Sequence, residues 1–551
     1  MGARLTFGGQ LAKLREFRST RPDAGRIALA TVSRHSFSST SRKMVPCLST
    51  VLQTAKASPV SLTAPVGTSA GRQEPSSLTK KGALQVAEKD VFMKHIGPKL
   101  QDMFIDPIAI DQLLEEVNNG LPKRPDGLDT PFSRIGGPTA TSTSLASVLC
   151  LANAAGVAPE IAIFELYNQL AEANGHPPIE RMSLPVPMSK IVDGGMHGAI
   201  DSRGKPVTPI QEFLFIPAGY SKWTDALSST MEATERFWEL MDIQGFDIKI
   251  GAEAGIISEN LRSNRQVLQL MSMVIRGFNG KPPLPGMFIG MDVAASELFN
   301  EKSNEYFLGA DGIRRFGSEN VNFGEMISYY RELQRDFPSI ISLEDAFAEE
   351  HLEAWEVGFR RLGSDSLQIT DDATVTQPHL VSKFIKFGDG GLLTKVNQGG
   401  SFTRTATAMG IAAQNNWPRI LSHRSSEAAD FDFEAIMAIA TGAEFLKVTI
   451  GSVKGGGGGR EARVNRVSDT NVLMEALWKG MNPKHEDWDI FRTFWKGIPE
   501  DYRMDGLPYH GLVLRYAENA PAWLKRAQQL MEQRENGHPE SYEYDRSPWF
   551  I

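Results

Sequence analysis

Apolar and polar positions between residues 287 and 451 repeat in one pattern. A short apolar run ends in a charged or polar residue, and helix-like sequence then leads to the next run. The last residues of successive runs are 52, 27, 24, 28 and 24 positions apart. Every step except the first matches one strand plus one returning helix, the spacing of successive βα units. The six runs are Met287–Asp292, Ile340–Glu344, Leu367–Asp371, Leu392–Lys395, Arg419–His423 and Phe445–Lys447.

These runs are apolar on both faces, which is typical of parallel strands buried between two layers. In barrels built from such strands, functional groups gather at the strand C-termini. The pattern therefore predicts that six polar residues project into one mouth: Asp292, Glu344, Asp371, Lys395, His423 and Lys447. Two extended runs occur earlier, before Gly194 and from Gln211 to Ile216, with no helical pattern between them. This barrel should therefore begin differently from a plain repeat of βα units.

The sequence upstream of the barrel predicts a compact α+β or mostly helical first domain. Helical patterns occur from Ser77 to Leu114, from Leu145 to Ala155 and from Ala162 to Leu170. The regular pattern stops near residue 480, and the remaining tail contains four tryptophans and proline-rich joints. The predicted division is a transit-like or disordered extension, a cap domain, a barrel and an aromatic-rich C-terminal extension, over residues 1–45, 46–180, 181–480 and 481–551.

Composition fits a globular chain that is long enough for two domains, with 551 residues of which 41% are apolar. The formal charge of −8 argues against nucleic acid as the principal partner. Cys47 and Cys150 cannot form a disulfide framework, which suits a reducing compartment or indifference to redox conditions. No apolar run reaches the length of a membrane span, and the nearest, Leu145 to Val157, is interpreted as a buried helix.

The first 43 residues differ in charge from the remainder of the chain. They carry a net charge of +7, which leaves −15 for the other residues, and they are rich in Arg and Ser. This composition is typical of a mitochondrial transit peptide. The alternatives are a poorly ordered basic extension, or translation that starts at Met44. The expected location is mitochondrial if the segment is a transit peptide and cytoplasmic otherwise.

Three carboxylates, Asp292, Glu344 and Asp371, end three consecutive predicted strands. Any one of them alone is more simply a solvated charge at a strand end. Three in register instead indicate hard oxygen ligands, which suit the octahedral coordination of Mg²⁺. Lys395 ends the next strand, where a nearby cation and partial desolvation would lower its pKa enough for it to act as a base. A structural salt bridge to the carboxylates is the alternative.

Cationic groups follow at the next two predicted strand ends. The sequence Ser422 to Ser425 places His423, Arg424 and Ser425 together, and the Arg424 guanidinium offers a planar fork for phosphate or carboxylate. Lys447 adds a second cationic contact. An isolated Arg is more often a surface residue, but its place at a strand end favours an anion site.

Residues outside the repeating stretch add weaker candidates. His197 follows two glycines, Glu212 opens an apolar strand and Glu253 lies in the sequence GAEAG, so two acids facing a lysine could form an acid/base pair. A single His or Glu is more often structural. Ser69 lies in a glycine-bearing segment predicted to be a mobile loop, between small neighbours that leave it accessible to a ligand. The glycines at 455–459 predict a flexible loop rather than a phosphate cradle, because no GK[ST] follows them.

Together these segments resemble the enolase family over about residues 64–465. APVGTSAG resembles the family's serine loop, DGGMHG its histidine loop, QEF its first acidic strand and GAEAG the segment that bears the catalytic glutamate. MDVAASE, LEDAFAEE and DDATVT resemble the three metal-binding strands, KVNQ the catalytic-lysine strand and SHRSSE the signature. The fold that this resemblance implies is α/β: an α+β cap domain followed by an eight-stranded TIM-like barrel with one antiparallel strand.

The resemblance also implies a reaction, the Mg²⁺-dependent dehydration of 2-phosphoglycerate to phosphoenolpyruvate. Lys395 would remove the proton at C2, and Glu253, aided by Glu212, would protonate the departing C3 hydroxyl. Mg²⁺ would stabilise the negative charge of the intermediate electrostatically. The implied metal ligands are Asp292, Glu344 and Asp371, with Ser69 at a second Mg²⁺, and the implied substrate contacts are His197, His423, Arg424, Ser425, Lys447, Glu344 and Asp371.

The sequence also departs from the family pattern near the substrate pocket. The family's first strands are not recognisable before Ser69, an insertion lies at Ala199 to Pro206, and Ala252 replaces an acid beside Glu253. Two alternatives therefore stay open: an enolase-like lyase acting on a related phosphonate or 2-hydroxy acid, or a non-catalytic enolase-like binding protein. The expected partners are a small phosphorylated substrate and a second copy of the chain, as a homodimer, with neither nucleic acid nor membrane.

Overall fold

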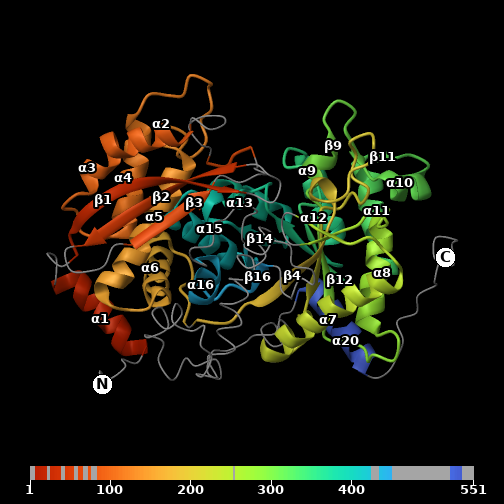
Figure 1. The fold of residues 1–551 in the computed structure, drawn as a ribbon. Helices are drawn as coiled ribbons and strands as arrows, with labels where there is room; N and C mark the ends of the chain where they lie inside the picture. Colours follow the sequence, from red (N-terminus) through yellow and green to blue (C-terminus); the bar gives the residue numbers. More distant parts are fainter. Residues whose placement is uncertain are drawn as a thin grey trace. The chain divides into compact units, whose positions relative to one another are not determined.

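The structure is a computed structural model in which the chain forms two compact units. Unit 1 comprises residues 1–188, 250–255 and 369–510, and unit 2 comprises residues 189–249, 256–368 and 511–551. The residues described are 7–20, 25–38, 44–54, 60–65, 72–75, 84–180, 182–221, 223–251, 255–422, 433–448 and 521–535. Figure 1 shows the elements of each unit, coloured along the sequence.

Unit 1 opens with a helix and a three-stranded antiparallel sheet. The elements are α1 (Phe7–Thr20), β1 (Ile27–Ser38), β2 (Met44–Thr54) and β3 (Val60–Pro65), and the sheet order is β1-β2-β3. Arg15 on α1 forms a two-pronged ion pair with Glu165, at 2.8 and 2.9 Å. This part of the chain therefore contributes a helix and a strand to unit 1, and its interpretation as a transit-like extension stays a prediction.

Helices follow the sheet in unit 1. They are α2 (Leu84–Val91), η1 (Phe92–Ile96), α3 (Gly97–Leu100), α4 (Pro107–Gly120), α5 (Gly137–Ala155) and α6 (Pro159–Asn174). Helix α5 is almost entirely buried, and its small residues allow close contact with the sheet, where Thr50 Oγ1 lies 2.7 Å from Ser142 Oγ. Within the described ranges, no single helix is long and apolar enough to cross a membrane, and α5 and α6 meet that test only as a pair bent by 116°.

Unit 1 also contains parallel strands that alternate with helices, the first of them from residue 369 on. The strands are β13 (Leu367–Thr370), β14 (Gly391–Thr394), β15 (Arg419–Ser422) and β16 (Phe445–Val448), and each pairs with the next in parallel. The helices are α13 (Pro378–Phe384), η3 (Ile385–Phe387), α14 (Val396–Gly399), α15 (Phe402–Gln414) and α16 (Phe433–Ala440). Every described side chain of these strands is buried, as continuous apolar runs predict.

Unit 2 contains the strands that precede these in the sequence, the first of them from residue 189 on. β4 (Val186–Asp193), β5 (Glu212–Ile216), β8 (Phe288–Asp292) and β12 (Ile340–Glu344) lie side by side. β5 runs antiparallel to both β4 and β8, whereas β8 and β12 are parallel. The expected antiparallel strand near the start of the barrel is therefore confirmed as β5. Short strands β6 (Lys249–Ile250) and β7 (Ile256–Ile257) continue beyond β4.

The helices of unit 2 surround these strands. They are η2 (Gly195–His197), α7 (Trp223–Ile243), α8 (Asn264–Arg276), α9 (Ala295–Leu298), α10 (Gly309–Phe316), α11 (Phe323–Asp336) and α12 (Leu352–Leu362). A separate small sheet contains β9 (Phe299–Asn300), β10 (Glu305–Phe307) and β11 (Asn320–Val321). The buried face of α11 includes Met326, Tyr330 and Leu333, as their spacing at i, i+4 and i+7 predicts.

Part of the C-terminal extension belongs to unit 2 as helix α20 (Ala522–Glu535), drawn in blue in Figure 1. Trp523 and Leu524 on this helix are buried. Arg526 donates to the carbonyl of Gln334 at 2.6 Å, and Arg534 donates to the carbonyl of Met287 at 2.9 Å and to Ser339 Oγ at 2.7 Å. Helix α20 is thus fixed beside the N-terminal ends of β8 and β12, opposite their carboxylate ends.

Candidate active site

Four acidic residues form one row across the strands of unit 2. Asp193 pairs in register with Glu212, Glu212 with Asp292, and Asp292 with Glu344. Because β5 is antiparallel, its first residue aligns with the last residues of β4, β8 and β12. All four side chains are buried, with at most 5% of each residue exposed. The sheet topology therefore brings together Glu212, Asp292 and Glu344, three of the acids predicted from sequence.

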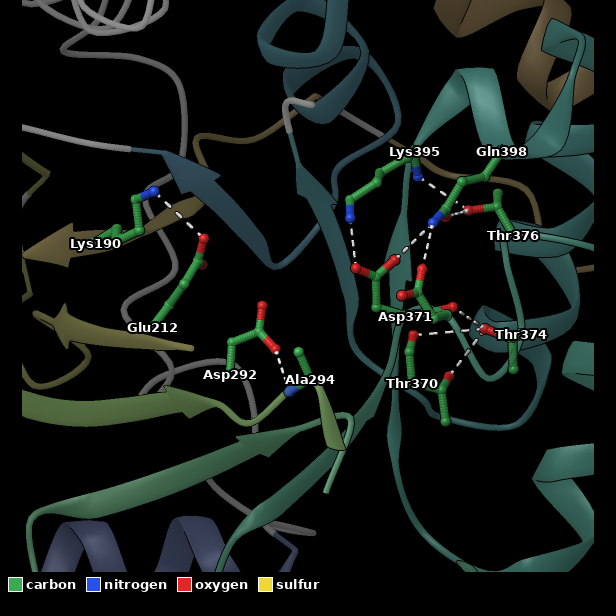
Figure 2. A network of polar contacts seen from close by, with 11 residues as sticks. Lys190, Glu212, Asp292, Ala294, Thr370, Asp371, Thr374, Thr376, Lys395 and Gln398 are labelled. Atoms are coloured by element: carbon green, nitrogen blue, oxygen red, sulfur yellow. Dashed lines mark hydrogen bonds and ion pairs between the residues drawn. The ribbon is translucent and has the colours of Figure 1, made fainter. Parts of the chain in front are cut away.

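A buried lysine that the sequence argument missed contacts this row. Lys190 Nζ lies 2.8 Å from Asp193 Oδ1. It also lies 3.3 Å from Glu212 Oε1, the contact drawn in Figure 2. The strand register shifts between Lys190 and Val192, so Ile191 is an extra residue in β4. In a regular strand, side chains three positions apart point to opposite faces, and this irregularity turns Lys190 and Asp193 to the same face. The available signal was a lysine and an aspartate within an otherwise apolar strand.

In unit 1, Lys395 and Asp371 form a tight ion pair. Lys395 Nζ lies 2.5 Å from Asp371 Oδ2, and Gln398 Nε2 donates to Asp371 Oδ1 at 2.9 Å (Figure 2). Burial raises the pKa of Asp371, but the ammonium groups of Lys395 and Lys447 outweigh burial and hold that pKa below its usual value. Asp371 is therefore ionised, and the predicted base, Lys395, has a carboxylate partner.

Lys447 is also buried in unit 1, with 5% of the residue exposed. It is in register with Ser422, the last residue of β15, because β15 and β16 are parallel and adjacent. Lys447 therefore lies beside the end of β15, and its contact with a substrate stays a prediction. His423, Arg424 and Ser425, which follow β15, lie outside the described residues, as do Ser69, Ala252, Glu253 and the glycines at 455–459.

The backbone after the acidic strand ends adopts unusual conformations in both units. Ala294 and Asp345 have φ angles of 47° and 42°, and Val375 and Thr376 have φ angles of 40° and 53°. A β-branched residue such as Val375 rarely adopts a positive φ, and such strain concentrates at functional sites. One consequence is visible after β8, where the Ala294 amide donates to Asp292 Oδ1 at 3.1 Å (Figure 2) and holds that carboxylate.

His197 lies in the short helix η2, where it is partly exposed. The glycines before it are required by close packing, because a Cβ on Gly194 would lie 2.2 Å from the carbonyl oxygen of Ile210. The insertion after His197 is ordered by Asp201, whose Oδ1 accepts from the amides of Arg203 and Lys205 at 2.8 and 2.9 Å. Arg203 Nη1 and Nη2 donate to the carboxylate of Glu319 at 3.0 Å each.

The donor chemistry of unit 2 fits a hard divalent cation. Asp292 and Glu344 are neighbours in register at two strand ends, and both are buried. Carboxylate oxygens are the ligands that Mg²⁺ prefers, and it normally retains water or substrate oxygens to complete its octahedron. The two residues are therefore suited to supply oxygen ligands, while Asp371 offers a further ionised carboxylate within unit 1.

Acids and lysines stand at the strand ends of this α/β fold, an arrangement typical of α/β-barrel enzymes. A family model described as "Enolase, C-terminal TIM barrel domain" matches residues 181–479. Enolases from Bifidobacterium longum strains DJO10A and NCC 2705 and from its subspecies infantis are each 30% identical over 384 residues. That match covers 69% of this chain and 77% of each relative. The chain therefore belongs to the enolase family of lyases, and the predicted α/β barrel class is confirmed.

Proposed function

We propose that the protein is a Mg²⁺-dependent lyase that dehydrates 2-phosphoglycerate to phosphoenolpyruvate. The observation that supports this most is the register of Glu212, Asp292 and Glu344, which places an acid and two metal-type ligands on adjacent strand ends. Structural salt bridges alone do not require this alignment. Lyase chemistry is the simplest explanation of these aligned acids, because the chain belongs to the enolase family.

The proposed reaction needs one base and one acid. Lys395 must first lose its own ammonium proton, which the positive charge of a bound Mg²⁺ would favour by lowering the pKa of the lysine. The neutral Lys395 Nζ then accepts the proton from C2 of the substrate, the electron pair forms the C2–C3 double bond, and the C3 hydroxyl leaves as water after Glu253 protonates it. Glu212 assists Glu253. A positioned base or acid of this kind contributes about 10²–10⁴-fold to rate.

Mg²⁺, held in this proposal by Asp292, Glu344 and Asp371 with Ser69 at a second ion, would offset the negative charge that builds on the substrate carboxylate. Arg424 and Ser425 bind the phosphate, and Lys447 contacts the carboxylate side. His197 and His423 line the pocket. These assignments follow the family pattern, and a homodimer is proposed on the same ground.

The experiment is a Mg²⁺-dependent assay that follows phosphoenolpyruvate formation by absorbance. The full-length protein should turn over 2-phosphoglycerate, and Lys395→Ala should reduce kcat by about 10²–10⁴-fold. Calorimetry must show that the variant still binds Mg²⁺, so that the loss is assigned to the base. Absence of turnover in folded, Mg²⁺-loaded wild-type protein would contradict the proposal.

A second candidate is enolase-like chemistry on a related phosphonate or 2-hydroxy acid. The ordered insertion favours this candidate, because Asp201 and Arg203 fix an extra turn within the segment that follows His197. Deleting Ala199 to Pro206 should then change the preference between 2-phosphoglycerate and such analogues. Unchanged relative kcat/KM values would count against this candidate.

A further inference from the structure

Lys190 is a buried cation of unit 2 that contacts its row of carboxylates. Its residue is 2% exposed, and the side chains of Asp193 and Glu212 that it contacts are 0% and 6% exposed. A buried ammonium is unfavourable unless it is paired and hydrogen-bonded. The two carboxylates supply that pairing, as ion pairs at 2.8 and 3.3 Å.

The position of Lys190 is set by the irregularity in β4. Lys190 is in register with Leu214, two residues after Glu212 on β5, so Lys190 and Glu212 lie on the same face as diagonal neighbours. The extra residue, Ile191, then brings Asp193 to this face as well. A β-bulge that re-aims a charged side chain is a feature common beside active sites. The backbone irregularity therefore directs the ammonium at Glu212.

The row itself is divided by these contacts. Lys190 lies against Asp193 and Glu212, whereas Asp292 and Glu344 form the other end of the row and have the donor chemistry for Mg²⁺. Like charges on adjacent strands repel, and without a cation a carboxylate in Glu212's place would turn away from its neighbour Asp292. The ammonium counters that repulsion at the end of the row where the proposed acid assembly lies.

We propose that Lys190 is a positioning residue that holds the Glu212 carboxylate in its working orientation. This inference rests on the proposed function for its kinetic consequence, but its electrostatic consequence does not depend on the substrate. The alternative is a purely structural role, in which Lys190 only neutralises Asp193. The two roles separate in a variant from which Lys190 and the Asp193 charge are both removed.

The experiment compares Lys190→Met with the double variant Lys190→Met/Asp193→Asn. Methionine keeps the unbranched stem, and the double variant removes one charge of each sign, so the net charge of the row is unchanged. Circular dichroism and thermal unfolding confirm folding of each protein. Steady-state kinetics with 2-phosphoglycerate then give kcat and KM separately, and calorimetry with Mg²⁺ alone gives the metal affinity.

In both variants kcat should fall about 100-fold, the scale for a misplaced catalytic group, while KM stays within about threefold of wild type. Mg²⁺ affinity should instead follow net charge: about tenfold tighter in Lys190→Met and near wild type in the double variant. Recovery of kcat in the double variant would show a structural role and overturn the proposal.

Failure of the proposed function gives a different result. If wild-type protein does not turn over 2-phosphoglycerate, the calorimetric arm still decides whether Lys190 acts electrostatically on the carboxylate row. Mg²⁺ affinity that is identical in wild type and folded Lys190→Met would overturn the inference on that arm. If Lys190→Met does not fold, the charge-balanced double variant carries the kinetic test alone.

Discussion

Arg419 provides a quantitative test of the packing that holds the strand ends of unit 1. Its residue is 4% exposed, and its guanidinium contacts both carboxylate oxygens of Glu444 at 3.1 Å. It also donates to the carbonyls of Thr441 and Gly442 at 3.0 and 2.8 Å, and to the hydroxyl of Tyr167 at 3.3 Å. The side chain thus joins the start of β15, the turn before β16 and helix α6.

Replacing Arg419 with Met leaves Glu444 buried with its charge largely uncompensated. Removing one partner of a buried ion pair lowers the free energy of unfolding by about 3–5 kcal/mol. The carbonyls of Thr441 and Gly442 also lose their donor, which places the expected loss in the upper part of that range. We expect a loss of about 4 kcal/mol, which is roughly a 10³-fold rise in the opening equilibrium. Removing the Glu444 charge as well, in Arg419→Met/Glu444→Gln, should recover about 2 kcal/mol.

The assay is hydrogen exchange of peptides that cover β15 and β16, because it reports opening of this region rather than of the whole two-unit chain. Arg419 begins β15, at the end of the strand opposite Ser422, so kcat in the absence of denaturant should stay near wild type. Equal destabilisation in the single and double variants would refute the reasoning, since the stranded charge would then contribute nothing.

Three further predictions concern other parts of the chain. Burial raises the pKa of Glu160 to about 7, so the folded protein holds a proton that the unfolded chain releases, and stability should fall as pH rises from about 4.5 to 7. Glu160→Gln should remove this dependence of the free energy of unfolding on pH, measured by urea unfolding, and should raise that free energy by roughly 2–3 kcal/mol at pH 8. An unchanged pH dependence in the variant would contradict the prediction. Arg534→Ala leaves the Met287 carbonyl without this donor and should lower the free energy of opening of α20 by about 2 kcal/mol. Faster amide hydrogen exchange in α20 would report this loss, and Arg534→Lys should lose less. Arg203→Ala frees the insertion from Glu319 and should raise KM about threefold with kcat kept; a changed kcat alone would count against it.

The barrel strands were predictable because burial on both faces leaves a continuous apolar run. The run Ile340–Glu344 is β12 residue for residue, and the described part of the run Arg419–His423 is β15, Arg419–Ser422. The polar strand ends were predictable for the same reason, since each interrupts an apolar run at its last position. That is how Asp292 and Glu344 were identified before their register was known.

The N-terminal sheet was not predictable by the same reasoning. β1 contains three Ser with one Thr, one Arg and one His, and this polar composition suggested a targeting segment more strongly than its alternation suggested a strand. Pairing with β2 along its length, from Ile27 to Ser38, supplies the hydrogen bonds that local sequence does not reveal. Helix α20 escaped prediction similarly, because its fixation depends on carbonyls far away in the sequence.

Lys190 shows a third limit, which concerns irregular backbone. Its role depends on the extra residue Ile191, since a regular strand would point Lys190 and Asp193 to opposite faces. The alternation of residues along a strand does not reveal this one-residue shift. A lysine and an aspartate three positions apart in an apolar strand indicate an ion pair only once the register with Glu212 is known.

The most direct test of the central claim is turnover of 2-phosphoglycerate by the full-length protein with Mg²⁺, compared with Lys395→Ala under the same conditions. We predict phosphoenolpyruvate formation that depends on Mg²⁺ and falls by about 10²–10⁴-fold in the variant, while calorimetry shows that the variant retains Mg²⁺ binding. Folded, Mg²⁺-loaded wild-type protein that forms no phosphoenolpyruvate, or a Lys395→Ala variant as active as wild type, would contradict it.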